Sequence, residues 1–313
     1  MQLDYQSSLY LSLSLYYVQT RMKKRDQKLK DIINWAKENE EIRALLLTSS
    51  LVNPLAPVDD FSDLDVEIIF ENNTAYVEHS TWLNLFGVPI AILEEDDSYF
   101  DGKHAMKMVL YEDHIKVDFK LFSKAQFLKE AKTEELPEDW DIGYQVLLDK
   151  DDITKGLKKP SYRVSIIKRP SIEEFQRILN DFWWDTTYVA KCLARGDIFY
   201  AKFMSEDNIR TAYLVSLIEW HVASQHQWNI TTNKHGRLFK KYLQEHEWQM
   251  VEATFSGSDI NDNWNALFAM ADLVHKIGNV LAEKLEGTYP HQLELKVRNY
   301  LSEVRTGHSI PPQ

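Results

Sequence analysis

Two short segments near residue 50 carry residue types that suit metal-dependent phosphate chemistry. The first, Leu47-Thr48-Ser49-Ser50, is the end of an apolar run followed by small residues, and the second is Asp63-Leu64-Asp65-Val66. Mg²⁺ prefers hard oxygen ligands, which aspartates supply. A turn of small residues lets backbone N–H groups and a hydroxyl approach the phosphates of a nucleotide. The two segments together predict phosphoryl or nucleotidyl transfer.

The aspartates belong to segments with the period of a β-strand. Apolar and acidic residues alternate from Asp63 to Ile68, and a second alternating run extends from Ile115 to Leu121. Successive side chains of a strand point to opposite faces of the sheet. We therefore expect Asp63 and Asp65 on one polar face and Asp118 on the polar face of another strand. Glu67 shares the first of these faces, where we expect it at a solvent-exposed strand end.

Nucleotidyl transfer needs the cluster that these strands would form. An oxygen nucleophile attacks the α-phosphorus of a nucleoside triphosphate, and two divalent cations roughly 3.5–4 Å apart can hold the attacking and leaving oxygens. Asp63, Asp65 and Asp118 are the candidate metal ligands, and Asp118 is also a candidate base for the attacking hydroxyl. Ser49 and Ser50 are the candidate phosphate-binding residues. An isolated Asp-x-Asp is also typical of a solvated strand edge, so the prediction depends on the three features together.

Composition limits the partners. The 313 residues include 44% hydrophobic residues, and the formal net charge is −12. A domain that binds duplex nucleic acid is usually basic, so long nucleic acid is excluded as a partner. An acidic surface instead attracts metal ions and polycationic small molecules, although acidity also serves solubility alone. We expect a cationic small molecule as the acceptor.

The single cysteine, Cys192, cannot form an intramolecular disulfide, which fits a reducing compartment, and its apolar helical surroundings predict a buried thiol. The apolar run from Leu9 to Val18 is too short to cross a bilayer. Its N-terminal flank also lacks the basic residues of a signal peptide. We therefore expect a cytoplasmic protein without a membrane segment.

The chain changes character near residue 165. Before it, helical and strand patterns alternate, whereas beyond it the rhythm is helical almost throughout. Ser171 and Glu174 form a capping-box pattern that opens a long helix, and Gly196 is positioned to end it. The prediction is an α+β protein: an N-terminal extension (1–24), a mixed-sheet domain (25–165), a helical bundle (166–305) and a tail (306–313).

Several motifs resemble the aminoglycoside 6-adenylyltransferase family within the polymerase-beta-like nucleotidyltransferases. That superfamily has Gly-Ser followed by Asp-x-Asp. Further similar stretches are Leu147-Leu148-Asp149-Lys150-Asp151, Ile167-Lys168-Arg169-Pro170, Asp181-Phe182-Trp183, Thr187-Tyr188-Val189-Ala190-Lys191 and Trp220-His221-Val222-Ala223-Ser224-Gln225. The resemblance covers residues from about 25 to 290. It implies ATP as AMP donor, Mg²⁺ as cofactor and the 6-hydroxyl of streptomycin as acceptor.

The resemblance also suggests site residues in the second half of the chain. Lys191, with Arg195 one helical turn away, is a candidate phosphate-binding or substrate-binding residue, and the alternative is a surface ion-pair residue. Lys168 is a candidate for binding the triphosphate, although linker charges are usually just solvated. Trp220 is a candidate substrate-binding residue.

In the first half, Glu94 and Glu95 lie in an acidic run that would attract a cationic acceptor, or that forms a solvated loop. They complete the candidate substrate-binding residues.

The chain departs from the family pattern at defined positions. Ser49 stands where the family has Gly, and Leu51 stands where it has Arg. Ser216 replaces another Arg, and Asn233-Lys234-His235-Gly236 replaces a Gly-Lys-Asn-Tyr stretch. Three hypotheses follow: transfer of AMP to an aminoglycoside such as streptomycin, the same transfer to another hydroxyl-bearing metabolite, and a non-catalytic descendant that binds a nucleotide or a partner.

Overall fold

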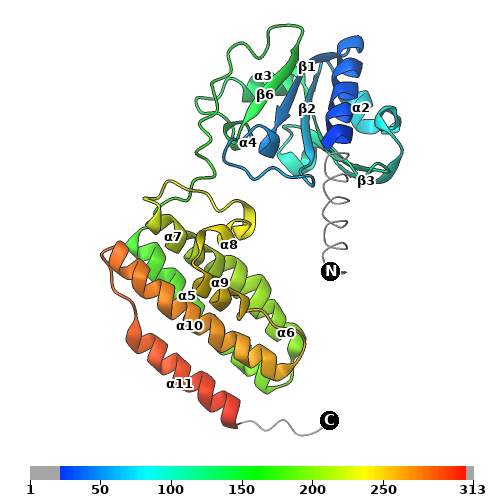
Figure 1. Cartoon of the computed structure of the whole chain (residues 1–313). Helices are drawn as coiled ribbons and strands as arrows, with labels where there is room; N and C mark the ends of the chain where they lie inside the picture. Colours follow the sequence, from blue (N-terminus) through cyan, green and yellow to red (C-terminus); the bar gives the residue numbers. More distant parts are fainter. Residues whose placement is uncertain (1–21, 308–313) are drawn as a thin grey trace, which may run out of the picture. The chain divides into compact units, whose positions relative to one another are not determined.

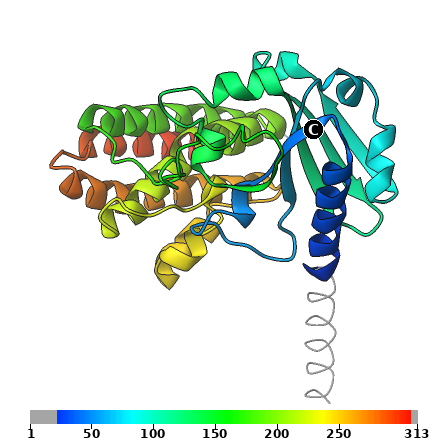
Figure 2. The same ribbon diagram turned by 90° about the horizontal axis from the view of Figure 1, so that it is seen from above.

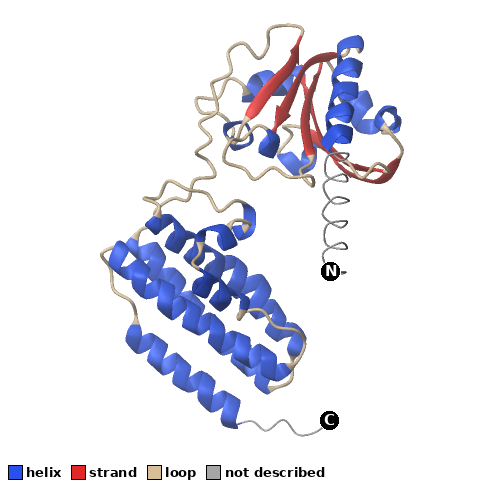
Figure 3. Cartoon of the chain, viewed as in Figure 1, coloured by secondary structure: helices blue, strands red, loops and turns tan. Residues whose placement is uncertain are grey.

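The computed structural model describes residues 22–307, so the predicted extension and tail lie largely outside the described residues. The chain divides into two compact units between Ser165 and Ile166. Figure 3 shows strands in the first unit and helices throughout the second. The predicted α+β class is confirmed. Within the described residues, no helix is both long and apolar enough to cross a membrane.

The first unit contains a mixed six-stranded sheet. Its strands are β1 (Ile42–Thr48), β2 (Leu64–Phe70), β3 (Pro89–Glu95), β4 (Ala105–Tyr111), β5 (Lys116–Ser123) and β6 (Tyr144–Asp149), in the spatial order β3-β4-β5-β2-β1-β6. Only the central β2–β5 pair is parallel among these described strands; the other neighbours are antiparallel. The sequence patterns located β1, β2 and β5, but not β4 or β6.

Helices cover the two faces of this sheet unequally. The helix at residues 22–38 runs along one face (Figures 1 and 2), where Ile32 and Ala36 join a large apolar core. On the other face, α3 (Lys124–Glu130) and α4 (Glu138–Asp141) contribute Phe127 and Trp140 to a much smaller core. The short helix α2 (Thr74–Glu78) also packs with the first core, through Tyr76. The second face is thus only partly covered, which leaves room for polar side chains.

The second unit is a helical bundle around one continuous core (Figure 1). It comprises α5 (Ile172–Ala194), α6 (Ile198–Lys202), the π-helical segment η4 (Phe203–Leu214), α7 (Val215–Gln225), α8 (Phe239–Tyr242), α9 (Glu245–Glu252), α10 (Ile260–Lys284) and α11 (His291–Gly307).

The ends of α5 match the sequence signals. The Ser171 hydroxyl accepts a hydrogen bond from the Glu174 backbone N–H at its start, and Gly196 adopts φ +73° just past its end. The αL conformation there favours glycine, so the predicted stop signal is confirmed. Cys192 is buried in the same helix, as predicted.

Glu67 corrects one expectation. It was predicted at a solvent-exposed strand end, but its exposed fraction is 0%. Lys120 Nζ lies 3.1 Å from Glu67 Oε1, and the Trp140 indole N–H donates to Oε2 at 2.7 Å. Burial alone lowers the pKa of Lys120, but the carboxylates of Glu67 and Asp139 raise it to about 12. The strand pattern predicted the face of Glu67 correctly. It could not predict the burial of Glu67, because Trp140, which covers it, is distant in sequence.

This buried pair generates a stability prediction. Lys120→Met leaves the Glu67 carboxylate buried without its cation, so we expect the free energy of unfolding to fall by about 3–5 kcal/mol. Glu67→Gln combined with Lys120→Met should lose clearly less, because no uncompensated charge remains. Denaturant unfolding of the single and double variants measures both values. An equal loss in the two would show that the charges are not energetically coupled.

Candidate active site

The parallel pairing of β2 and β5 places two carboxylates side by side. Asp65 and Asp118 are partners in the strand register, and neighbouring strands lie about 4.8 Å apart. Both residues lie on the partly covered face and are half-buried, with the Asp118 side chain 15% exposed. Like charges directly opposite one another in a sheet destabilise it. The arrangement therefore holds more negative charge than the sheet itself favours.

Asp63 joins the pair from the residue just before β2. Lys116 Nζ lies 3.3 Å from Asp63 Oδ2 and 2.9 Å from Asp118 Oδ2, so one ammonium bridges the two carboxylates. Arg25 fixes the approach to this position, since its guanidinium donates to the backbone carbonyls of Asp59 and Ser62. Two central strands and one anchored loop thus bring three carboxylates together near the start of β2 and β5.

The electrostatics of the cluster appear in the pKa of Asp65. Burial is the largest cause, and the charges of Asp118 and Asp63 add to it, so that the pKa rises from 3.8 to about 6. A hydrogen bond from the Ser49 side chain and the charge of Lys116 act in the opposite direction. A divalent cation would relieve the same repulsion far more strongly, and three carboxylates are the oxygen donors that Mg²⁺ prefers. The cluster therefore fits Mg²⁺.

The turn after β1 carries the two candidate serines. A 3₁₀ turn (Ser49–Leu51) follows Thr48, and Ser49 adopts φ +64°. That left-handed conformation is adopted freely by glycine and at some cost by other residues. Sequence reasoning attributed the family's glycine to close approach of the phosphates. The structure adds a conformational reason that holds without any ligand.

Comparison with known proteins finds relatives that match most of this chain. The family model Streptomycin adenylyltransferase matches residues 22–304. The chain is 31% identical over 270 residues to an aminoglycoside 6-adenylyltransferase of Bacillus subtilis, covering 85% of this chain and 93% of the relative. A Campylobacter jejuni protein of the same name is 26% identical, with coverages of 89% and 95%.

The chain belongs to the streptomycin adenylyltransferase family. Its members named above are nucleotidyltransferases, and this chain is an enzyme of that class. Among solved structures, an aminoglycoside 6-adenyltransferase from Bacillus subtilis has a TM-score of 0.44 at 25% identity, covering 90% of this chain and 98% of that chain. The family model and the Bacillus subtilis relative at 31% identity confirm the resemblance stated from sequence motifs.

The two acidic residues expected near the acceptor lie on different faces of the sheet. Glu94 opposes Lys107, and Lys107 opposes Phe119. This register places Glu94 on the face opposite to Asp118, where it pairs with Lys107 at 3.3 Å and accepts a hydrogen bond from Ser80. The structure therefore does not bring Glu94 to the carboxylates.

Glu95 lies on the same face as the carboxylates. It opposes Met106, which in turn opposes Lys120. Because β4 lies between β3 and β5, Glu95 is two strands away from Asp118 on that face. Of the two candidates, only Glu95 is on the side of the sheet that carries the cluster.

The remaining candidates belong to the second unit. Lys191 lies on α5 with its Nζ 4.1 Å from the centre of the Tyr188 ring, and Lys168 is exposed before the helix begins. Trp220 is only 7% exposed and is part of the helical core. Its indole therefore supports the packing of α7, and a direct contact with substrate needs a movement of that core.

Lys116 is the charged residue of the cluster that sequence reasoning missed as a site residue. The alternation of the β5 segment already placed it on the face of Asp118, two positions away. The sequence does not show that β2 and β5 pair in parallel, and it is this pairing that brings Asp63 within reach of the Lys116 ammonium.

The raised pKa of Asp65 predicts a dependence of stability on pH. A carboxyl whose pKa is higher in the folded state than in the unfolded state contributes to the stability of the fold. This contribution to the free energy of unfolding is complete below about pH 4 and is lost as the pH rises through about 6. Asp65→Asn removes the buried charge. In metal-free buffer at pH 8, we expect its free energy of unfolding to exceed that of the parent by about 1–3 kcal/mol.

The difference in free energy of unfolding between Asp65→Asn and the parent should vanish near pH 4, where the Asp65 carboxyl is protonated. At pH 8 it should become smaller when Mg²⁺ is added, because a cation stabilises the charged form of Asp65. Denaturant unfolding at the two pH values measures it. The matched control is Asp152→Asn, whose side chain is 80% exposed and which should show no such difference. An Asp65→Asn protein that is less stable than the parent at pH 8 would contradict the charge repulsion.

The backbone of Ser49 predicts an order among three variants. Ser49→Gly and Ser49→Ala both remove the hydroxyl that hydrogen-bonds to Asp65, but only glycine relieves the positive φ. We expect the glycine variant to be more stable than the alanine variant by about 1 kcal/mol, measured by denaturant unfolding. Equal stabilities would mean that the turn changes conformation when the hydroxyl is lost.

Proposed function

We propose that the protein transfers AMP from ATP to a hydroxyl group of an aminoglycoside, with the 6-position of streptomycin as the leading candidate. Membership of the streptomycin adenylyltransferase family supports the class of reaction. The observation that carries the proposal is the juxtaposition of Asp63, Asp65 and Asp118 at the start of the central strands β2 and β5, with the Ser49 side chain hydrogen-bonded to Asp65. We further propose Mg²⁺ as the cofactor and the cytoplasm as the location.

The reaction balances with one bond formed and one broken. The acceptor oxygen forms a bond to the α-phosphorus, the bond from that phosphorus to the bridging oxygen breaks, and pyrophosphate leaves. The acceptor proton passes to a carboxylate. Asp118 is the first candidate, because it lies on the strand beside Asp65 and shares an ammonium with Asp63. Bound Mg²⁺ supplies neutralisation of the negative charge that develops on the phosphates.

For this reaction, the protein would supply charged and polar groups that are in position before the substrates bind. Asp63, Asp65 and Asp118 would hold the cation, and Ser49 and Ser50 would orient the phosphates through the turn. The ammonium of Lys116 already neutralises part of the carboxylate charge. The positive charge of Lys116 therefore reduces the electrostatic repulsion between the carboxylate cluster and an incoming triphosphate.

Residues beyond the carboxylate cluster are proposed for substrate recognition. Lys191 and Lys168 would bind the triphosphate or the substrate. Glu95, on the face of the cluster, is the stronger of the two acidic candidates for the cationic acceptor. The formal net charge of −12 also favours encounter with a polycation.

The decisive experiment supplies the protein with ATP, Mg²⁺ and streptomycin and measures both pyrophosphate release and the mass of the product. We expect an adenylylated streptomycin. Asp118→Asn should lower the rate by about 100-fold or more, because a charged group that acts on the transition state is removed. Asp152→Asn, on an exposed loop, should keep the parent rate.

The same assay separates the alternatives. Pyrophosphate and product only with another hydroxyl-bearing acceptor would retain the chemistry and reject streptomycin. ATP binding without turnover over a panel of acceptors would identify a non-catalytic nucleotide-binding protein. Full activity of Asp118→Asn would reject the role of the cluster.

A further inference from the structure

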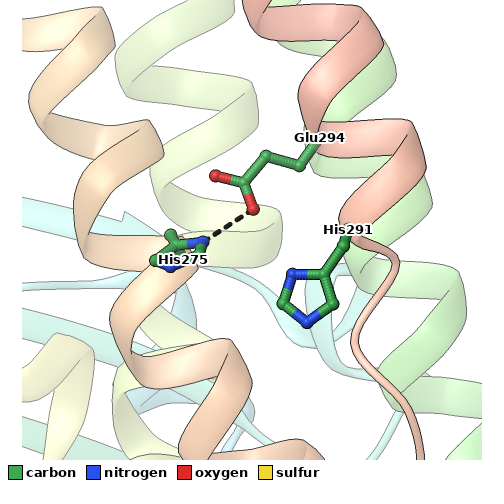
Figure 4. Close-up of side chains that lie close together, drawn as sticks. All are labelled: His275, His291 and Glu294. Carbon is green, nitrogen blue, oxygen red and sulfur yellow. Dashed lines mark hydrogen bonds and ion pairs between the residues drawn. The ribbon is translucent and has the colours of Figure 1, made fainter.

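Three metal-ligating side chains converge on the helical unit, in a part of the chain that the transfer chemistry does not use. His275 comes from α10, and His291 and Glu294 come from the first turn of α11 (Figure 4). One ligand atom of each lies within 4.8 Å of the others. His275 Nδ1 is 2.7 Å from Glu294 Oε2. The cluster joins two helices at a single point.

The backbone explains this convergence. His291 and Glu294 are three residues apart on a helix, so their side chains lie on the same face. His275 meets them from the neighbouring helix. Both imidazoles are exposed, whereas the Glu294 side chain is 8% exposed. An ion therefore has access from solvent, and the carboxylate is held in place before any ion arrives.

Surrounding residues orient all three groups. Arg298 Nε donates to Glu294 Oε1 at 2.7 Å, which leaves Oε2 directed at the His275 imidazole. The Tyr289 ring lies edge-on to both imidazoles, with centroid distances of 5.7 Å to His275 and 5.0 Å to His291. In metal sites, a hydrogen bond such as that from Arg298 fixes the orientation of a ligating carboxylate.

We propose that His275, His291 and Glu294 bind one divalent transition-metal ion of the zinc class. Two imidazoles and one carboxylate suit Zn²⁺, Ni²⁺ or Cu²⁺, whereas Mg²⁺ and Ca²⁺ prefer all-oxygen sites such as the aspartate cluster of the first unit. Three protein ligands leave a fourth position for water. The ion would clip α11 to α10 and so stabilise the last helix of the described chain.

The first test is Zn²⁺ titration of the untagged full-length chain without nucleotide, followed by calorimetry and thermal unfolding. Asp65→Asn serves as the background, because it weakens the other metal-binding cluster. We expect one bound Zn²⁺ that this substitution does not remove. Excess Zn²⁺ should raise the melting temperature by about 5–10 °C, since ligand binding at roughly 100 times Kd stabilises the folded state.

The variant His291→Ala removes an exposed ligand and should lower the Zn²⁺ affinity by more than about tenfold and abolish the thermal shift. His246→Ala, an exposed imidazole on α9, is the matched control and should change neither. Equal melting temperatures of the parent and both variants in chelator would show that the fold is intact. His275→Asn is the second variant, should His291→Ala fail this check.

Bound Co²⁺ gives a readout of the ligands themselves. We expect visible absorption that is present in the parent and His246→Ala and lost in His291→Ala. Zn²⁺ binding that is unchanged in both His291→Ala and His275→Asn would overturn the proposal, and so would an equal thermal shift with Mg²⁺ in the Asp65→Asn background. Neither readout depends on nucleotide transfer, so the outcome is independent of the proposed activity.

Discussion

The repulsion between Asp65 and Asp118 is the interaction on which the rest of the first unit depends. Two acidic residues in register on adjacent strands are unfavourable, and burial makes them more so. The surroundings compensate only in part: Lys116 shares its ammonium between Asp118 and Asp63, and Ser49 hydrogen-bonds to Asp65. The negative charge that stays uncompensated would attract a cation. The fold thus maintains a local instability that binding of the proposed Mg²⁺ would relieve.

The parallel strand pair confines this instability to one end. On the face that carries Asp65 and Asp118, the next residue pair is Glu67 with Lys120, and the pair after that is Ile69 with Phe122. Within three residue pairs the face changes from like charges to an ion pair and then to apolar core. The helices α3 and α4 cover only the latter part, through Phe127 and Trp140. Packing therefore stabilises one end of the two strands while the other end stays available for chemistry.

Sequence alone predicted the elements whose patterns are local. The alternation of β2 and β5 placed the three aspartates correctly on a polar face, and the α+β class followed from the change of rhythm. Glu67 was misjudged because its burial depends on Trp140, which follows after several intervening elements. The face of Glu94 depends on its pairing with Lys107 in β4, a strand that no pattern revealed. Contacts between distant segments, rather than local propensity, account for these errors.

Ser49 shows how a site can depart from its family without losing its geometry. A side chain at φ +64° carries a conformational cost that glycine would avoid. The same side chain hydrogen-bonds to Asp65, whose pKa is raised by burial and by the neighbouring carboxylates. At this turn, the hydrogen bond from Ser49 to Asp65 therefore offsets part of the conformational cost of the Ser49 backbone. Since the compensating hydroxyl lies beside the expected phosphate position, the substitution acts on the same charge that the substrate must approach, and any change in transfer should appear first in nucleotide binding.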